Sequence, residues 1–217
     1  MPSPWPASAL SLTMGGLAIV VGALMCGLVP LLSRLTGRPR IRTGLVLSAV
    51  AILVGLTAYL ACIRAGEWWA GCGLGFAAAC LTAMAAIDAR WLVIPDLHVI
   101  LLMVLALIGP LAPGIGATIL GAILGSGLLW VVRALFLRLK GIEAMGLGDV
   151  KLMAAVGALV GPFRVLWIIV AASVLGVVWG LIRSRGRLAA APPAPFGAMA
   201  ALPALAVLAW SNLGVAA

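Results

Sequence analysis

The chain has 217 residues, of which 65% are hydrophobic and only 9% are charged, with a formal net charge of +9. A soluble domain needs far more charge to cover its core, so this composition excludes an ordinary soluble fold. The basic residues occur in small groups between apolar stretches and not along one face, so we expect no nucleic-acid partner despite the positive charge.

The apolar stretches repeat from end to end and predict an all-α, polytopic transmembrane helical bundle. A helix of about 20 residues crosses a hydrocarbon core of about 30 Å. The first nine residues hold no Lys or Arg, so we expect the first span to be retained and not removed as a secretory signal. The sixth span is short, and we expect it to be tilted, partly buried or begun earlier. Cutting at charges and prolines gives about eight spans, at roughly 9–33, 43–63, 68–87, 96–112, 115–137, 148–161, 164–182 and 197–213.

The loops between these spans predict the topology, because Lys and Arg collect on the cytoplasmic side of a membrane. If the loop 34–42 is cytoplasmic, only Arg64 and Arg164 fall outside. Both termini then also lie outside, while Asp88, Asp96, Glu143 and Asp149 face the cytoplasm. The cytoplasmic side holds twelve of the fourteen basic residues: Arg34, Arg38, Arg40, Arg42, Arg90, Arg133, Arg138, Lys140, Lys151, Arg183, Arg185 and Arg187.

Small residues and cysteines are expected to serve packing. The cysteines Cys26, Cys62, Cys72 and Cys80 form no C-x-x-C pair, so we expect buried small side chains and neither a metal site nor a disulfide framework. Glycines four residues apart let membrane helices approach closely and predict three packing seams. These pairs are Gly121 and Gly125, Gly157 and Gly161, and Gly176 and Gly180.

Two aspartates stand at the edges of predicted spans. Asp88 ends the third span in the segment 88–96 (DARWLVIPD), and Asp149 opens the sixth in the segment 146–152 (GLGDVKL). Ionisable groups inside a bilayer are costly and are often functional. Two carboxylates that share one proton can hydrolyse a peptide without a metal or cofactor.

Each aspartate also has a structural interpretation as a helix cap. Charge and spacing alone do not decide between the catalytic role and the capping role. Asp96, directly after Pro95, fits a cap or a loop-shaping role better than a catalytic one. Gly146 and Gly148 would let the backbone approach a partner closely.

Helix dipoles suggest roles for the pair. Asp88 lies at the C-terminal end of its predicted helix and Asp149 at the N-terminal end of its own. We therefore expect a protonated Asp88 and an ionised Asp149, with Asp149 as the base.

Segments 88–96 and 146–152, in this order, resemble the paired motifs of the type IV prepilin peptidases, bacterial Gly-x-Gly-Asp membrane aspartic proteases. The segment Pro195-Phe196-Gly197 is similar to a third family element, and the resemblance covers roughly 68–213. It implies an endopeptidase of the bacterial inner membrane that cuts the short basic leader from prepilins or pseudopilins on the cytoplasmic side. It implies that Asp88 and Asp149 are catalytic, without cofactor or metal. The supporting motif residues are Gly146, Gly148, Lys151, Pro95 and Asp96.

The N-terminal part departs from this family pattern. Many members also N-methylate the new N-terminus with a region whose cytoplasmic loop often carries two C-x-x-C pairs, whereas the loop 34–42 is short and has no Cys. We therefore expect no methyltransferase activity and assign no S-adenosylmethionine. The predicted organisation is a reduced N-terminal membrane region, 1–67, and a peptidase membrane domain, 68–217.

Other interpretations stay open at this stage. A polytopic transporter could use the carboxylates for proton or ion coupling, and a structural subunit of a pilus or secretion assembly could use them as caps. Lys151 could tune Asp149 or serve as a topology anchor, and the single histidine, His98, is expected to be interfacial. Membrane lipid is an expected partner, and the sequence leaves open whether the chain forms a homo-oligomer.

Overall fold

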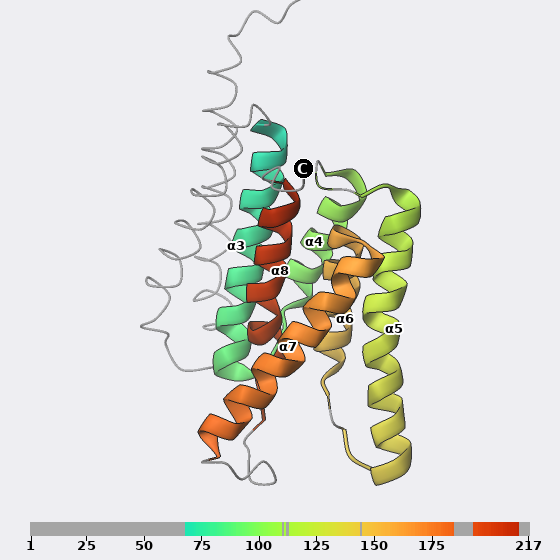
Figure 1. Ribbon diagram of the computed structural model, residues 1–217, viewed down its shortest axis with the longest axis vertical. Helices are drawn as coiled ribbons and strands as arrows, with labels where there is room; N and C mark the ends of the chain where they lie inside the picture. The colour runs from blue at the N-terminus through green and yellow to red at the C-terminus, as the bar shows by residue number, and fades with distance from the viewer. Residues whose placement is uncertain (1–67, 110, 112, 144, 185–192, 213–217) are drawn as a thin grey trace, which may run out of the picture. The chain divides into compact units, whose positions relative to one another are not determined.

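A computed structural model of the protein describes residues 68–109, 111, 113–143, 145–184 and 193–212 (Figure 1). Every regular element in these ranges is an α-helix, which confirms the all-α prediction for this part of the chain. The predicted spans 9–33 and 43–63 lie outside the described residues, as does the loop between them.

Each predicted span within the described ranges corresponds to one helix. The largest differences in bounds concern two ends: the third span, predicted to end at 87, continues to Trp91, and the fourth, predicted to end at 112, ends at Ile108. The helices are α3 (Trp68–Trp91), α4 (Asp96–Ile108), α5 (Ile115–Lys140), α6 (Leu147–Val160), α7 (Pro162–Arg183) and α8 (Phe196–Asn212).

Three of these helices are long and apolar enough to cross a membrane: Gly73–Trp91 of α3, Ile115–Lys140 of α5 and Pro162–Arg183 of α7. The apolar segments Asp96–Ile108 and Phe196–Ser211 are shorter. This pattern agrees with a multi-pass membrane protein.

The chain divides into two compact units, which are described separately. The first contains the described residues 68–83 and 208–212, and the second contains residues 84–207. In the first unit Leu74, Cys80 and Leu208 are buried, as predicted for Cys80. The side chains of the other three cysteines lie outside the described residues.

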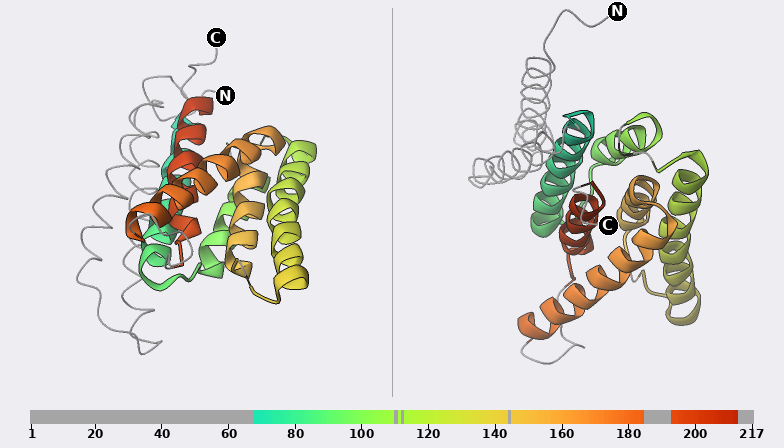
Figure 2. Two further views of the ribbon diagram at one scale, coloured as in Figure 1. Left: turned by 60° about the horizontal axis from the view of Figure 1, so that its bottom comes forward. Right: turned by 45° about the horizontal axis from the view of Figure 1, so that its top comes forward.

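In the second unit α6 is the central helix. It contacts α4, α5 and α7, as Figures 1 and 2 show. A helix that is apolar on all sides is typical of a protein interior, which explains why this 14-residue helix resembles a span in the sequence. Its buried residues are Val150, Leu152, Met153, Ala155, Val156, Gly157, Ala158, Leu159 and Val160.

Glycines hold α6 close to α5. A Cβ atom added at Gly121 would collide with the backbone carbonyl of Gly157, and the reverse is also true. A Cβ atom at Gly125 would collide with the carbonyl of Met153 in the same way. The predicted seam is therefore confirmed at these glycines. At Gly176 the prediction was wrong, because no atom lies within 4 Å of an added Cβ.

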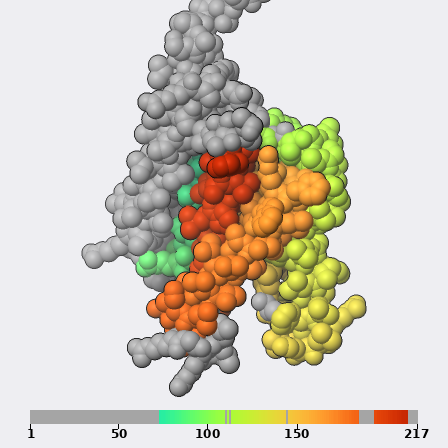
Figure 3. All heavy atoms as spheres, viewed as in Figure 1, coloured from blue at the N-terminus to red at the C-terminus, as the bar shows by residue number. Residues whose placement is uncertain are grey.

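The outer faces of α5 and α7 carry large exposed apolar side chains. Trp130 on α5 is 58% exposed and Trp167 on α7 is 73% exposed. The space-filling view shows α7 lying open across one face of the molecule (Figure 3). Such faces on helices of spanning length suit a hydrocarbon environment.

Candidate active site

Asp88 lies one turn before the end of α3 and is only 3% exposed. Just past the end of the helix, the amide of Leu92 donates a hydrogen bond to the carbonyl of Asp88 at 2.8 Å. Leu92 has a φ of 54°, the only positive φ of a non-glycine residue in the described ranges. This conformation costs an L-residue roughly 1–2 kcal/mol. It turns the chain sharply, so that the segment 92–95 passes beside the aspartate.

Asp149 lies in the first turn of α6, after a loop that begins where Gly141, with a φ of 64°, ends α5. The two motif glycines have different roles. A Cβ atom added at Gly148 would lie 3.1 Å from the Cβ of Ile94, so the close approach predicted for this glycine is present. Gly146 has an ordinary φ of −70°, and a Cβ there would be in normal contact with Asp149, so neither its conformation nor a close approach requires glycine.

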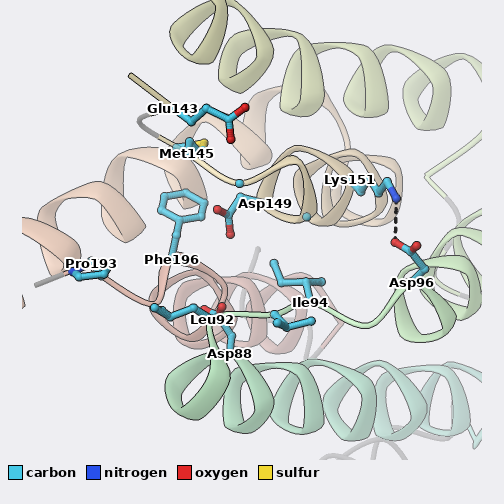
Figure 4. Close-up of a pocket in the computed structure, with 14 residues that line it drawn as sticks. Asp88, Leu92, Ile94, Asp96, Glu143, Met145, Asp149, Lys151, Pro193 and Phe196 are labelled. Atoms are coloured by element: carbon cyan, nitrogen blue, oxygen red, sulfur yellow. Dashed lines mark hydrogen bonds and ion pairs between the residues drawn. The ribbon is translucent and has the colours of Figure 1, made fainter. Parts of the chain in front are cut away.

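Both aspartates line one pocket of about 640 Å³ within the second unit. Figure 4 shows that Asp88 enters it from α3 and Asp149 from α6. All four acidic residues of the described ranges line this pocket, and Lys151 is the basic residue that lines it. The lining residues are Asp88, Leu92, Val93, Ile94, Asp96, Glu143, Met145, Gly146, Gly148, Asp149, Lys151, Pro193, Ala194 and Phe196.

The two carboxylates affect one another electrostatically. Asp149 lies outside the three helices of spanning length. Burial and the nearby charge of Asp88 raise the pKa of Asp149 to about 6, while a hydrogen bond from the backbone of Gly146 acts in the opposite direction. Below about pH 6 the pair therefore favours a state with one proton, because two close carboxylates resist double ionisation.

Asp88 accepts a hydrogen bond from a second helix. The backbone amide of Ala198, in the first turn of α8, donates to Asp88 Oδ2 at 3.0 Å. Both the hydrogen bond and the N-terminal end of a helix favour a negative charge on the acceptor. The sequence-based assignment considered the dipoles of α3 and α6 but no contact with α8. This contact favours the opposite assignment, with the proton on Asp149.

Asp96 does not cap α4 as expected. Pro95 occupies the N-cap position, and no side-chain hydrogen bond caps the helix. Instead, Asp96 Oδ1 lies 2.9 Å from Lys151 Nζ, as the dashed line in Figure 4 marks. The pair connects the start of α4 to α6, so the structure gives Lys151 a partner that neither sequence interpretation included.

Arg133 of α5 is a site residue that the sequence analysis treated only as a topology signal. Its side chain is 14% exposed, donates to the carbonyl of Met145, and lies 2.8 Å from Glu143 Oε1. It therefore holds both ends of the segment that precedes Gly146 and Asp149. No local pattern marks this role, because the partners lie in a different element.

His98 is buried on α4 and does not line the pocket, so the interfacial position expected for it was wrong. Within the described ranges, no group of three or more His, Cys, Asp and Glu side chains is placed to hold a metal ion.

Comparison with known proteins identifies the family. Residues 75–181 match the type IV leader peptidase family. The chain is 37% identical over 200 residues to a protein of Xanthomonas campestris pv. campestris named prepilin leader peptidase/N-methyltransferase, covering 85% of this chain and 67% of that protein. A protein of the same name from Pseudomonas aeruginosa is 36% identical over 79% of this chain and 59% of its own length. A protein of the same name from Burkholderia pseudomallei is 39% identical over 55% of this chain and 40% of its own length.

The chain thus spans less than two thirds of the length of the last two relatives. No solved structure matches it significantly. The family match favours a peptidase over a transporter or a structural subunit and confirms the prediction of a prepilin peptidase. The chain belongs to the type IV leader peptidase family.

Proposed function

We propose that this protein is an aspartic endopeptidase that removes the leader from type IV prepilins or pseudopilins, with Asp88 and Asp149 as its catalytic pair. The observation that carries the proposal is that these two carboxylates, from two motifs far apart in the sequence, line one pocket and interact electrostatically. The names of the relatives support the substrate class.

The geometry supports a division of roles. Asp88 Oδ2 accepts the Ala198 amide, which leaves Oδ1 to take a proton from water. As the water oxygen bonds to the scissile carbonyl carbon, the protonated Asp149 donates its proton to the carbonyl oxygen. When the intermediate collapses, the C–N bond breaks, Asp88 gives its proton to the leaving amine, and Asp149 recovers its own. The pair ends with one proton, as it began.

The charge of the pocket suits a basic leader. The whole chain carries +9, yet four acidic side chains and one lysine line the pocket. Glu143 has a 67% exposed side chain, so it is accessible to a substrate approaching from solvent. Complementary charge raises the rate of encounter and the selectivity for a basic peptide.

The active site is proposed to face the cytoplasm of a bacterial inner membrane, in an eight-span topology. In Figure 1, α3, α5 and α7 end on the same side, and their last turns carry Arg90, Arg138, Lys140 and Arg183. Asp88 belongs to the end of α3, so the pocket opens on this basic side. The excess of positive charge supports a cytoplasmic location.

The peptidase activity is assigned to residues 68–217, and residues 1–67 are proposed to lack methyltransferase activity, because the short loop 34–42 contains no Cys. The test is incubation of the purified full-length protein with a prepilin in detergent micelles, followed by mass spectrometry of the products. We expect cleavage between leader and apolar stem, with no methyl group added when S-adenosylmethionine is present. An intact prepilin after incubation with the wild-type protein would contradict the proposed function.

A further inference from the structure

The Pro195-Phe196-Gly197 segment has no role in the mechanism so far, yet it contacts the catalytic pocket. It opens α8, with Phe196 as the first helical residue. Pro195 and Gly197 are buried, and Phe196 lines the pocket beside the two aspartates (Figure 4).

Gly197 lies against the carboxylate of Asp88. A Cβ atom added there would lie 3.1 Å from Asp88 Oδ2, 3.2 Å from Asp88 Cγ and 3.2 Å from Ile94 Cδ1. These distances are shorter than ordinary van der Waals contact, so a side chain at this position would move the carboxylate, Ile94 or the start of α8.

This close approach brings the next amide into hydrogen-bonding distance. The Ala198 amide donates to Asp88 Oδ2 at 3.0 Å, across an interval of 110 residues in sequence. The first amides of a helix have no intrahelical acceptor, so this donor is available for the carboxylate.

We infer that Gly197 is a positioning residue for Asp88: its missing side chain lets the start of α8 reach the carboxylate, and the Ala198 amide then fixes Oδ2 and leaves Oδ1 for water. The inference rests on the proposed catalytic role of Asp88. The charged groups that share the pocket are Asp96 of α4, Glu143 of the preceding loop, and Asp149 and Lys151 of α6. Arg90 follows Asp88 on α3.

The first test is Gly197→Ala, assayed for prepilin cleavage across pH. Displacement of Asp88 from the Ala198 amide weakens a charge-assisted hydrogen bond, so the acidic limb of kcat/KM should move to higher pH by about one unit. We expect kcat to fall about tenfold with little change in KM, because leader binding does not use this contact. A structural role alone would lower activity without moving the pH profile.

A second variant removes the donor itself, with the proline ring Cδ atom in place of the amide hydrogen that faces Asp88 Oδ2. Ala198→Pro has no amide hydrogen, and proline is tolerated in the first turn of a helix. We expect the same upward shift of the acidic limb. This variant keeps the inference testable if Gly197→Ala does not accumulate as folded protein.

Two controls separate positioning from packing. Gly176→Ala adds a methyl group where no atom lies within 4 Å and should leave rate and pH profile unchanged. Adding Ile94→Val to Gly197→Ala removes Ile94 Cδ1, which would restore activity if the clash with Ile94 were the only defect. We expect no recovery. Recovery in the double variant would overturn the inference, and so would wild-type pH profiles in both Gly197→Ala and Ala198→Pro. The proposed function is tested separately, because it predicts that Asp88→Asn is inactive whatever these variants show.

Discussion

Ile94 packs directly against Gly148, so that the segment following Asp88 rests on the helix turn that carries Asp149. A Cβ atom at Gly148 would lie 3.1 Å from the Cβ of Ile94, and this neighbour cannot move away by rotating its side chain. The contact sets the spacing of the two catalytic segments through the backbone.

The first prediction therefore concerns the two glycines of the Gly-x-Gly-Asp motif. Gly148→Ala should lower kcat/KM about a hundredfold, because a displacement on the order of 1 Å at a catalytic group can cost this much. Gly146→Ala should cause a much smaller loss, since its Cβ would make an ordinary contact. Cleavage rates of the two variants, measured side by side, decide the point. Equal losses would show that Ile94 does not set the spacing.

The second prediction concerns pH. The pKa of Asp149 is raised to about 6 by burial and by the charge of Asp88. If Asp149 is the acid, its proton is lost as the pH rises through about 6, and activity should fall on that side. In Asp88→Asn the negative neighbour is absent, so the Asp149 carboxyl should titrate at lower pH. Carbon-13 NMR of labelled aspartate measures the pKa of Asp149 in the wild-type protein and in Asp88→Asn. An unchanged Asp149 titration in Asp88→Asn would show that the carboxylates are not coupled.

The third prediction tests the loop contact of Arg133. Arg133→Lys retains the charge but loses the forked geometry that reaches both Met145 and Glu143. We expect about a tenfold loss of kcat and faster hydrogen exchange at Met145 and Gly146. The matched control is Arg138→Lys in the exposed last turn of the same helix. Similar exchange rates in the two variants would refute the positioning role.

The fourth prediction is that the ion pair between Asp96 and Lys151 contributes little to stability. The Asp96–Lys151 pair is largely exposed, and exposed pairs contribute about 0–1 kcal/mol to stability. A double-mutant cycle with Asp96→Asn and Lys151→Gln, followed by thermal unfolding, should give a coupling energy in this range. A coupling energy well above it would mean that the pair is essential for holding α4 to α6.

The fifth prediction concerns substrate charge. Glu143→Gln should raise KM for a prepilin with a basic leader and reduce the dependence of KM on salt. Because the variant also weakens the ion pair with Arg133, a loss of kcat is expected as well, and it should be the same for every substrate. A substrate whose leader Lys and Arg are replaced by Gln should show no change of KM in the variant. If Glu143→Gln raises KM equally for both substrates, the residue does not recognise leader charge.

Local sequence features predicted much of the fold. The spans that became α3 to α8 were recognisable because apolar runs bounded by charge need no long-range information. The short predicted span at 148–161 is α6, a 14-residue helix packed inside the second unit, as the expectation of a partly buried span allows. Burial in protein and burial in lipid select the same residue types, so composition does not separate them.

The site shows the same limit. Asp88 and Asp149 were marked by their motifs, but the contacts that distinguish them come from elsewhere in the chain. The Ala198 amide and the Arg133 side chain reach the site only through packing of α8 and α5. At Leu92 the sequence has no glycine or asparagine that would predict a positive φ. These relationships depend on tertiary structure and leave no local signal.

The central claim is that Asp88 and Asp149 act as one catalytic unit. Its most direct test is the single-turnover cleavage rate of a prepilin by Asp88→Asn, Asp149→Asn and the double variant, each verified as folded. Because removal of either group abolishes the proton transfer, each single variant should be slower by about a hundredfold or more, and the double variant no slower than the worse single one. Wild-type cleavage by either single variant would contradict the claim.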